Sequence, residues 1–379
     1  MEEIQLALDF SEGLPLDVLA LRDVAHDFAA QKLRAAGLAA DRGGEAPLGV
    51  VREAGEIGLC APNVPDGFGG PGVSALAHAA MMEELGWGNL GAALAIGTQA
   101  LCAEAVLRAG DGEQQTRLLP GLCGAEDFQL GALALTLSQP AEGVRWSVAG
   151  GGYLLEGTAA FVANGGAADL TLVRASAAEG QALFAVRRSP GLTDLRRIET
   201  AGVRALLLSE LSFSACSVQE DARLGGADAA KTAAGVLGLA RVLCAAALIG
   251  TARAAYEEAA QYARSRVTFR RPIVEHEQVG GMLAQMRLRI QAARLMVYRA
   301  AGEIDAGRDA QLAAAEAAYL AGETALGATH DAVQAFGGYG FTQEFPVEMW
   351  MRDAAGARIA YGSGDDELRE VARAIASGV

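Results

Sequence analysis

The most informative part of the chain is residues 334–368, QAFGGYGFTQEFPVEMWMRDAAGARIAYGSGDDEL. A glycine-rich turn opens it at Gly337 and Gly338, an aromatic and acidic segment follows, and the run from Arg352 returns to helical character. Glycines without side chains let a backbone approach a ligand closely, so we expect functional residues here. The rest of the chain supplies the fold around them.

Length and composition indicate a folded protein of two or three domains. The chain has 379 residues, of which 51% are hydrophobic and 20% charged, as is typical of globular proteins. Its net charge of −15 argues against a nucleic-acid partner. No segment approaches the ~20 apolar residues of a membrane span, and the acidic start lacks the basic region of a signal peptide. We therefore expect a cytoplasmic protein without a membrane span.

The cysteines and histidines give no metal-binding pattern. The five cysteines lie far apart with no CxxC pair, which predicts reduced, mostly buried thiols. The four histidines show no HExxH spacing, so no metal site is expected.

Periodicity predicts three domains: a helical domain at 1–124, a β-domain at 125–228 and a helical bundle at 229–379. Helices are predicted over 14–37, 48–58 and 93–110, with another that begins near Ser74, whose hydroxyl could cap it. Short alternating runs over 128–226 predict a small antiparallel β-barrel or sandwich, with a hairpin turn at 149–152.

The last part of the chain is predicted to be a four-helix bundle, with helices over 229–266, 276–306, 309–335 and 366–375. The first of these is apolar on all sides. Such a helix is expected in the core of the bundle and at a subunit interface.

Several motifs occur in register along the chain: GLCAPNVPDGFGGPG at 58–72, GDGEQQTRLLPGL at 110–122, ARSRVTFRRPIVEH at 263–276 and QAFGGYGFTQEFPVEMWMRDA at 334–354. With them the chain resembles the flavin-dependent acyl-CoA dehydrogenases along essentially its whole length. The resemblance implies that family's fold, mainly α with a middle antiparallel β-domain and a C-terminal four-helix bundle.

The resemblance also implies a reaction. A carboxylate removes the α proton of an acyl-CoA thioester while FAD accepts the β hydride. The implied partners are a homologous subunit in a hetero- or homo-oligomer, expected to be a tetramer, and an electron-transfer flavoprotein as electron acceptor. Fatty acid or lipid metabolism is the implied setting.

One subunit of the family contributes residues to the ADP half of its neighbour's FAD. An arginine neutralises the diphosphate, and glycines let the backbone approach the phosphates. The family's glycine after the phenylalanine is replaced here by Arg270, which adds charge and bulk. Taken alone, the glycine pair would equally suit a helix C-cap. The matched residues are Arg266, Phe269, Gln334, Gly337 and Gly338.

On the flavin-ring side the chain departs from the family. Ser138 stands in the altered motif ALTLSQPAEGVRW, Phe161 replaces a tryptophan that lies against the ring, and Ala163 replaces a threonine that hydrogen-bonds the flavin. The last two changes each remove roughly 1 kcal/mol of interaction. We therefore expect this chain's own β-domain to bind the flavin poorly.

The family's catalytic base is missing from both positions where relatives carry it. Tyr361 occupies the usual glutamate position, and Ala240, before Arg241, occupies the alternative one. With a pKa near 10, tyrosine is a poor base at neutral pH. Asp365 and Glu367 could replace the base, although acidic residues there also suit the start of a helix.

Three functions remain open. The chain could be a base-lacking subunit that shares an FAD site with an unlike, acid-bearing partner. It could be a self-sufficient flavoenzyme with its base elsewhere, or a binding or scaffold protein that keeps the fold without redox function.

Overall fold

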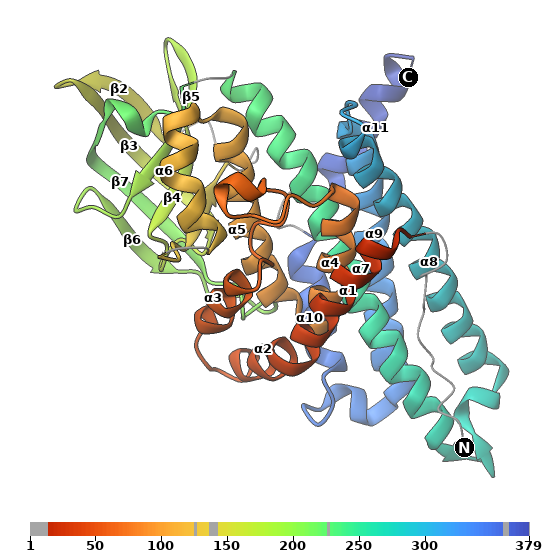
Figure 1. Ribbon diagram of the computed structural model, residues 1–379. Coiled ribbons are helices and arrows are strands. Elements are labelled where there is room, and N and C mark those ends of the chain that lie inside the picture. Colours follow the sequence, from red (N-terminus) through yellow and green to blue (C-terminus); the bar gives the residue numbers. More distant parts are fainter. Residues whose placement is uncertain (1–13, 125–126, 136–142, 226–227, 359–363, 379) are drawn as a thin grey trace.

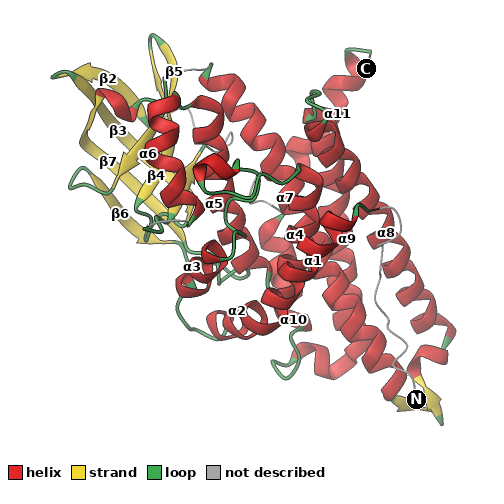
Figure 2. Cartoon of the chain, viewed as in Figure 1, coloured by secondary structure: helices red, strands yellow, loops and turns green. Residues whose placement is uncertain are grey.

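The computed structural model describes residues 14–124, 127–135, 143–225, 228–358 and 364–378. Helices precede and follow one group of strands, in the order that the sequence predicts (Figure 1). The large sheet lies at one side of the molecule and the helices fill the other (Figure 2).

Side-chain caps fix the starts of the N-terminal helices. The Ser74 hydroxyl accepts a hydrogen bond from the Ala77 N–H at 3.1 Å, which confirms the predicted cap. Asn89 caps the next helix, and Asp111 forms a capping box with Gln114. The helices are α1 (Leu16–Phe28), a π-helical turn (Ala29–Leu33), α2 (Arg34–Asp41), α3 (Leu48–Glu56), α4 (Ala75–Gly88), α5 (Leu90–Ala109) and α6 (Gly112–Cys123).

The middle of the chain forms one seven-stranded sheet that is not a barrel, so of the predicted antiparallel barrel or sandwich the barrel is wrong. The strand order is β1-β4-β2-β3-β7-β6, and β5 pairs with β4. Among the strands of the described ranges, β5 pairs only with β4 and β6 only with β7, so the sheet keeps these two strands as edges, and one residue pair, Leu133 with Ala163, also joins β1 to β3. Strands β1 and β2 also pair with β4 in parallel, which the alternation of side chains does not encode. The strands are β1 (Gly131–Ala134), β2 (Arg145–Ala149), β3 (Gly152–Ala163), β4 (Leu170–Ala177), β5 (Gly180–Arg187), β6 (Leu192–Arg197) and β7 (Leu208–Gln219).

The predicted hairpin at 149–152 is confirmed. Ala149 pairs with Gly152 across β2 and β3, and the two residues between them have φ values of +57° and +81°. Glycine adopts this left-handed conformation without strain, so Gly150 and Gly151 set the register of the hairpin.

The long helix α7 (Ala229–Ser265) is the centre of the helical bundle, as predicted. It packs against α8 (Glu277–Asp305) and α9 (Gln311–Phe336), while α10 (Val347–Ala357) and α11 (Gly364–Ala376) pack on α9. Helix α4 also packs on α7, and the two backbones come so close at Gly250 that an added Cβ there would lie 1.8 Å from the carbonyl oxygen of Glu83. The C-terminal bundle therefore includes a helix from the N-terminal part of the chain.

Two helices, α5 and α7, are long and apolar enough to cross a membrane, contrary to the expectation from composition. However, 89% and 83% of their most apolar windows are buried inside the fold. Their apolar character is thus explained by packing within the protein.

The five cysteines are free and buried, as predicted. Burial raises the pKa of the Cys60 and Cys102 thiols. The described residues contain no group of three or more His, Cys, Asp or Glu side chains placed to hold a metal ion.

Candidate functional site

Helix α7 ends far from the large sheet (Figure 1). A groove of about 500 Å³ lies at that end of the helix. Its walls include Tyr262 and Arg266 from the end of α7, and Phe336, Gly337 and Gly338 from the end of α9 and the 3-10 turn that follows (Gly337–Phe341). The structure therefore brings together three of the residues predicted to hold the ADP half of FAD.

The glycines keep one wall of the groove open. Gly337 has φ +56° and ψ −129°, a conformation essentially confined to glycine. A Cβ added at Gly337 or Gly338 would meet nothing within 4 Å, so the backbone faces free space. Gln334 is exposed in the last turn of α9, and its carbonyl accepts the N–H of Gly337. This backbone could be approached closely by an anionic ligand.

An aromatic cluster supports the groove from behind. Tyr262 stacks on Phe336 with ring centroids 4.1 Å apart, and Phe345 packs against both rings. This packing joins the ends of α7 and α9, and so fixes the position of Arg266 relative to the glycines.

A short hairpin beside the groove carries Phe269. It consists of β8 (Val267–Thr268) and β9 (Arg271–Pro272), joined by Phe269 and Arg270. Phe269 is 93% exposed. Because Arg271 can only donate, His276 accepts with Nδ1 at 3.0 Å and donates from Nε2 to Thr268 at 3.1 Å. These contacts hold the hairpin against the start of α8.

On the large sheet, a bulge in β3 presents Phe161. The β3–β7 register shifts between Ala159 and Val162, and Phe161 has φ +54° with 60% of its surface exposed. Asn164, which the sequence did not single out, donates from Nδ2 to the carbonyls of Ala95 (3.1 Å) and Gly131 (3.2 Å). A strained, exposed aromatic residue on a fixed bulge is suited to contact a ligand.

A buried pair of opposite charges joins α7 to α11. Arg241 lies 3.3 Å from Glu367 and donates to Glu370 at 2.5 Å. Burial raises the pKa of Glu367, and Arg241 opposes that change. The pair borders a cavity of about 20 Å³ that also contacts Cys244. The sequence could indicate Glu367 as an acid but not its pairing with Arg241.

Comparison with known proteins decides the family. The N-terminal domain model of acyl-CoA dehydrogenases matches residues 17–126, and the C-terminal domain model matches residues 227–376. The chain belongs to the acyl-CoA dehydrogenase family. It is 32% identical over 364 residues to an acyl-CoA dehydrogenase of Bacillus subtilis, with 91% of this chain and 94% of that protein covered.

Two solved structures show the same relationship. Butyryl-CoA dehydrogenase from Megasphaera elsdenii superimposes with a TM-score of 0.91 and 29% identity, over 97% of this chain and 100% of that one. A chain from the study of the electron transferring flavoprotein of Acidaminococcus fermentans gives a TM-score of 0.92 and 29% identity, over 97% and 99%.

The cofactor of this family is FAD, and the groove fits its ADP half. Arg266 supplies a cation, and Gly337 and Gly338 leave open space beside an accessible backbone. The position predicted to hydrogen-bond the flavin ring fits less well, because Ala163 is 8% exposed and has no hydroxyl to donate. Ser138 lies outside the described residues.

Neither of the two positions predicted for the base offers a described carboxylate. Ala240 is buried within α7, and Tyr361 lies outside the described residues. Of the two acids considered as replacements, Asp365 is exposed at the start of α11 and Glu367 is 4% exposed.

The Arg-Asp of the family signature is a structural clamp. Arg352 donates to both carboxylate oxygens of Asp41, at 2.8 and 2.7 Å, and to Glu348. The Asp353 carboxylate accepts the Val203 N–H at 2.6 Å, and burial raises its pKa to about 7. These contacts fasten α10 to the N-terminal helices and to the segment before β7.

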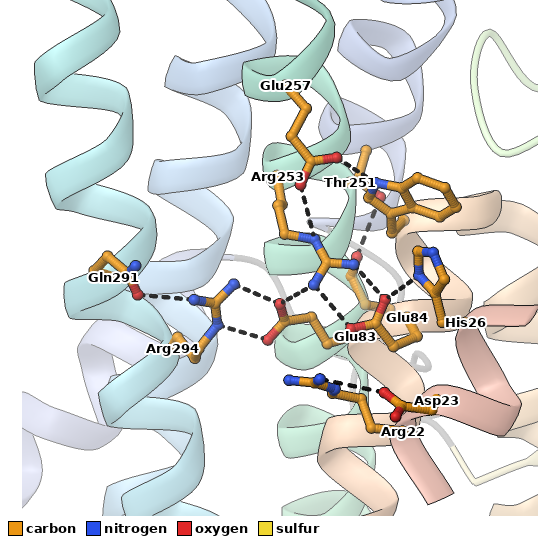
Figure 3. A network of polar contacts seen from close by, with 12 residues as sticks. Arg22, Asp23, His26, Glu83, Glu84, Thr251, Arg253, Glu257, Gln291 and Arg294 are labelled. Atoms are coloured by element: carbon orange, nitrogen blue, oxygen red, sulfur yellow. Dashed lines mark hydrogen bonds and ion pairs between the residues drawn. The ribbon is translucent and has the colours of Figure 1, made fainter. Parts of the chain in front are cut away.

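A second set of charges is buried between α1, α4, α7 and α8 (Figure 3). Arg294 binds Glu83 at 2.8 and 2.6 Å, and Arg253 binds both Glu83 and Glu84. His26 contacts Glu84 at 2.8 Å. Burial alone would raise the pKa of Glu84, but Arg253 and His26 hold it at about 2. This charge network has its counter-charges within the fold, so its role is structural.

Proposed function

We propose that this chain is the cofactor-contributing subunit of a two-chain, FAD-dependent acyl-CoA dehydrogenase. The groove carries the proposal: Arg266 and the Gly337–Gly338 backbone are open for a diphosphate, and Phe269 stands exposed beside them. The described residues at this chain's own flavin-ring and base positions, Ala163 and Ala240, have no functional group for those roles. A subunit that completes its partner's site needs the groove residues, but it does not need its own flavin-ring and base residues.

In this assignment the chain binds and orients rather than transfers protons. FAD, when bound, accepts the hydride from the β carbon of the acyl-CoA. Arg266 neutralises charge on the diphosphate, and the Gly337–Gly338 backbone lets the phosphates approach closely, because no side chain stands in the way. The Tyr262–Phe336 stack holds both in place. The carboxylate that removes the α proton comes from the partner chain, and an electron-transfer flavoprotein is the proposed electron acceptor.

Coexpression tests the proposal. The chain would be produced alone, and together with a homologue that has glutamate or aspartate at the position of Tyr361. We expect little flavin absorbance from the chain alone, and flavin absorbance with acyl-CoA oxidation from the complex. A yellow, active oligomer of this chain alone would contradict the proposal. A complex that assembles without flavin or activity would indicate a scaffold.

A second candidate is a self-sufficient enzyme whose base is Glu367. The observation in its favour is the buried Glu367 carboxylate at the small cavity, with a raised pKa, as general bases often have. Its pairing with Arg241 favours a structural role for Glu367 instead, because this contact anchors α11 to α7. Activity of the chain alone separates the two candidates.

A further inference from the structure

The hairpin beside the groove turns through two strained residues. The value of φ is +50° at Phe269 and +67° at Arg270, and no other consecutive non-glycine residues have positive φ in the described ranges. Such two-residue turns favour asparagine and glycine, because a Cβ is crowded there. The Phe269 ring makes an edge contact with His276 at 6.2 Å and is otherwise exposed. The fold thus keeps a strained turn without burying the side chains that strain it.

Arg266 and Arg270 differ from buried or half-buried arginines of the fold. Arg253, Arg294 and Arg352 are each held by carboxylates. In the part of the chain that the structure describes, the side chains of Arg266 and Arg270 have no hydrogen-bond or ion-pair partner. Arg266 lines the groove and Arg270 lies in the turn of the adjoining hairpin, so both leave positive charge beside the groove in a chain whose net charge is −15.

We infer that Arg270 is a second phosphate-binding residue, which acts with Arg266 on the diphosphate of FAD. The inference rests on the proposed function. A diphosphate carries two negative charges next to each other, and one guanidinium balances only one of them. Glycine at position 270 would relieve the backbone strain but would supply no charge. Strain at Arg270 without a partner inside the fold is consistent with a ligand that provides one.

The test separates charge from strain in the coexpressed complex. FAD would be removed and titrated back over a range of salt concentrations, with wild type, R270G, R270Q and R270K. R270G removes both the charge and the strain, whereas R270Q removes the charge and keeps the strain. We expect both to bind FAD about five- to tenfold more weakly at low salt, with a smaller dependence on salt. R270K should keep most of the affinity, and only R270G should melt at a higher temperature.

The control is K231A, which changes the net charge equally. Lys231 is exposed at the opposite end of α7, about 50 Å from Arg266 along the helix axis. It should bind FAD like wild type. If R270G and R270Q bind FAD with wild-type affinity and salt dependence, the role of Arg270 is overturned and the shared FAD site stands. A wild-type complex that takes up no FAD overturns the shared site, and the inference with it.

Discussion

Arg253 and Arg266 lie on the same helix, about 20 Å apart, yet their surroundings are opposite. Arg253 is enclosed in the charge network, where Glu83 and Glu84 supply its counter-charges (Figure 3). Arg266 faces an open groove and has no carboxylate partner among the described residues.

The difference separates charges that serve the fold from charges kept for a ligand. A buried ion must be paired, because removing it from water without a partner is very unfavourable. An exposed arginine meets no such demand and remains available for an anion. The mutations below test this division between the charge network and the groove.

The largest expected effect is in the charge network. R253A would leave Glu83 and Glu84 buried with less counter-charge, so we expect a loss of about 3–5 kcal/mol in the free energy of unfolding. Urea unfolding measures this loss. K231A, at an exposed lysine, is the control, and its free energy of unfolding should stay within about 0.5 kcal/mol of wild type. A loss in R253A no larger than in K231A would remove the distinction between the two regions.

Asp353 extends the test to a buried acid whose raised pKa of about 7 is caused by burial. In the unfolded chain its pKa should be near 3.8. The protonated Asp353 carboxyl therefore contributes fully to the stability of the fold below about pH 4, and this contribution is lost as the pH rises to about 7. The loss amounts to up to about 4 kcal/mol, at about 1.4 kcal/mol per pKa unit.

D353N should not show this pH dependence, because the amide oxygen can still accept the Val203 N–H without ionising. The free energy of unfolding at pH 5 and pH 8 measures this pH dependence, and D17N, at an exposed aspartate, is the control. If the free energy of unfolding changes equally between pH 5 and pH 8 in wild type and D353N, the Asp353 carboxylate is not buried as described.

In the groove, R266A should weaken FAD binding by the coexpressed complex about 10- to 100-fold, because a charge-assisted contact is lost. The melting temperature should hardly change. Arg264 lies on the last turn of α7 and is exposed, so R264A is a matched control for charge. If R266A lowers the melting temperature and leaves FAD affinity intact, then Arg266 belongs with the structural charges.

The smallest effect is expected for E367Q. If the partner supplies the base, turnover of the complex with acyl-CoA should stay within about twofold of wild type, as for the D365N control. A drop of more than about 100-fold, confined to E367Q, would instead assign the base to Glu367 and favour the self-sufficient enzyme.

Local sequence signals predicted most of the elements. The Ser74 cap, the hairpin at Gly150–Gly151 and the central place of α7 in the bundle were all confirmed, because each follows from residues that are close in sequence. The sheet was predicted less well. Its parallel pairs join strands that are distant in sequence, so alternation indicated strands but not their partners.

The candidate site divides in the same way. Motifs identified Arg266, Phe269, Gly337 and Gly338, and the glycines needed no structure to indicate close approach by a ligand. The bulge that exposes Phe161 could not be read from the sequence, because it depends on how β3 pairs with β7.

The sequence alone determined the family, the order of helices and strands, and the residue types available to bind a diphosphate. Only the tertiary structure decided which charged side chains are paired with opposite charges inside the fold. Arg241 pairs with Glu367 and Arg253 with Glu84 across more than 100 residues of chain, while Arg266 and Arg270 keep free side chains within the described residues. The reason is physical: burial forces charges into pairs, and burial is set by packing between distant segments.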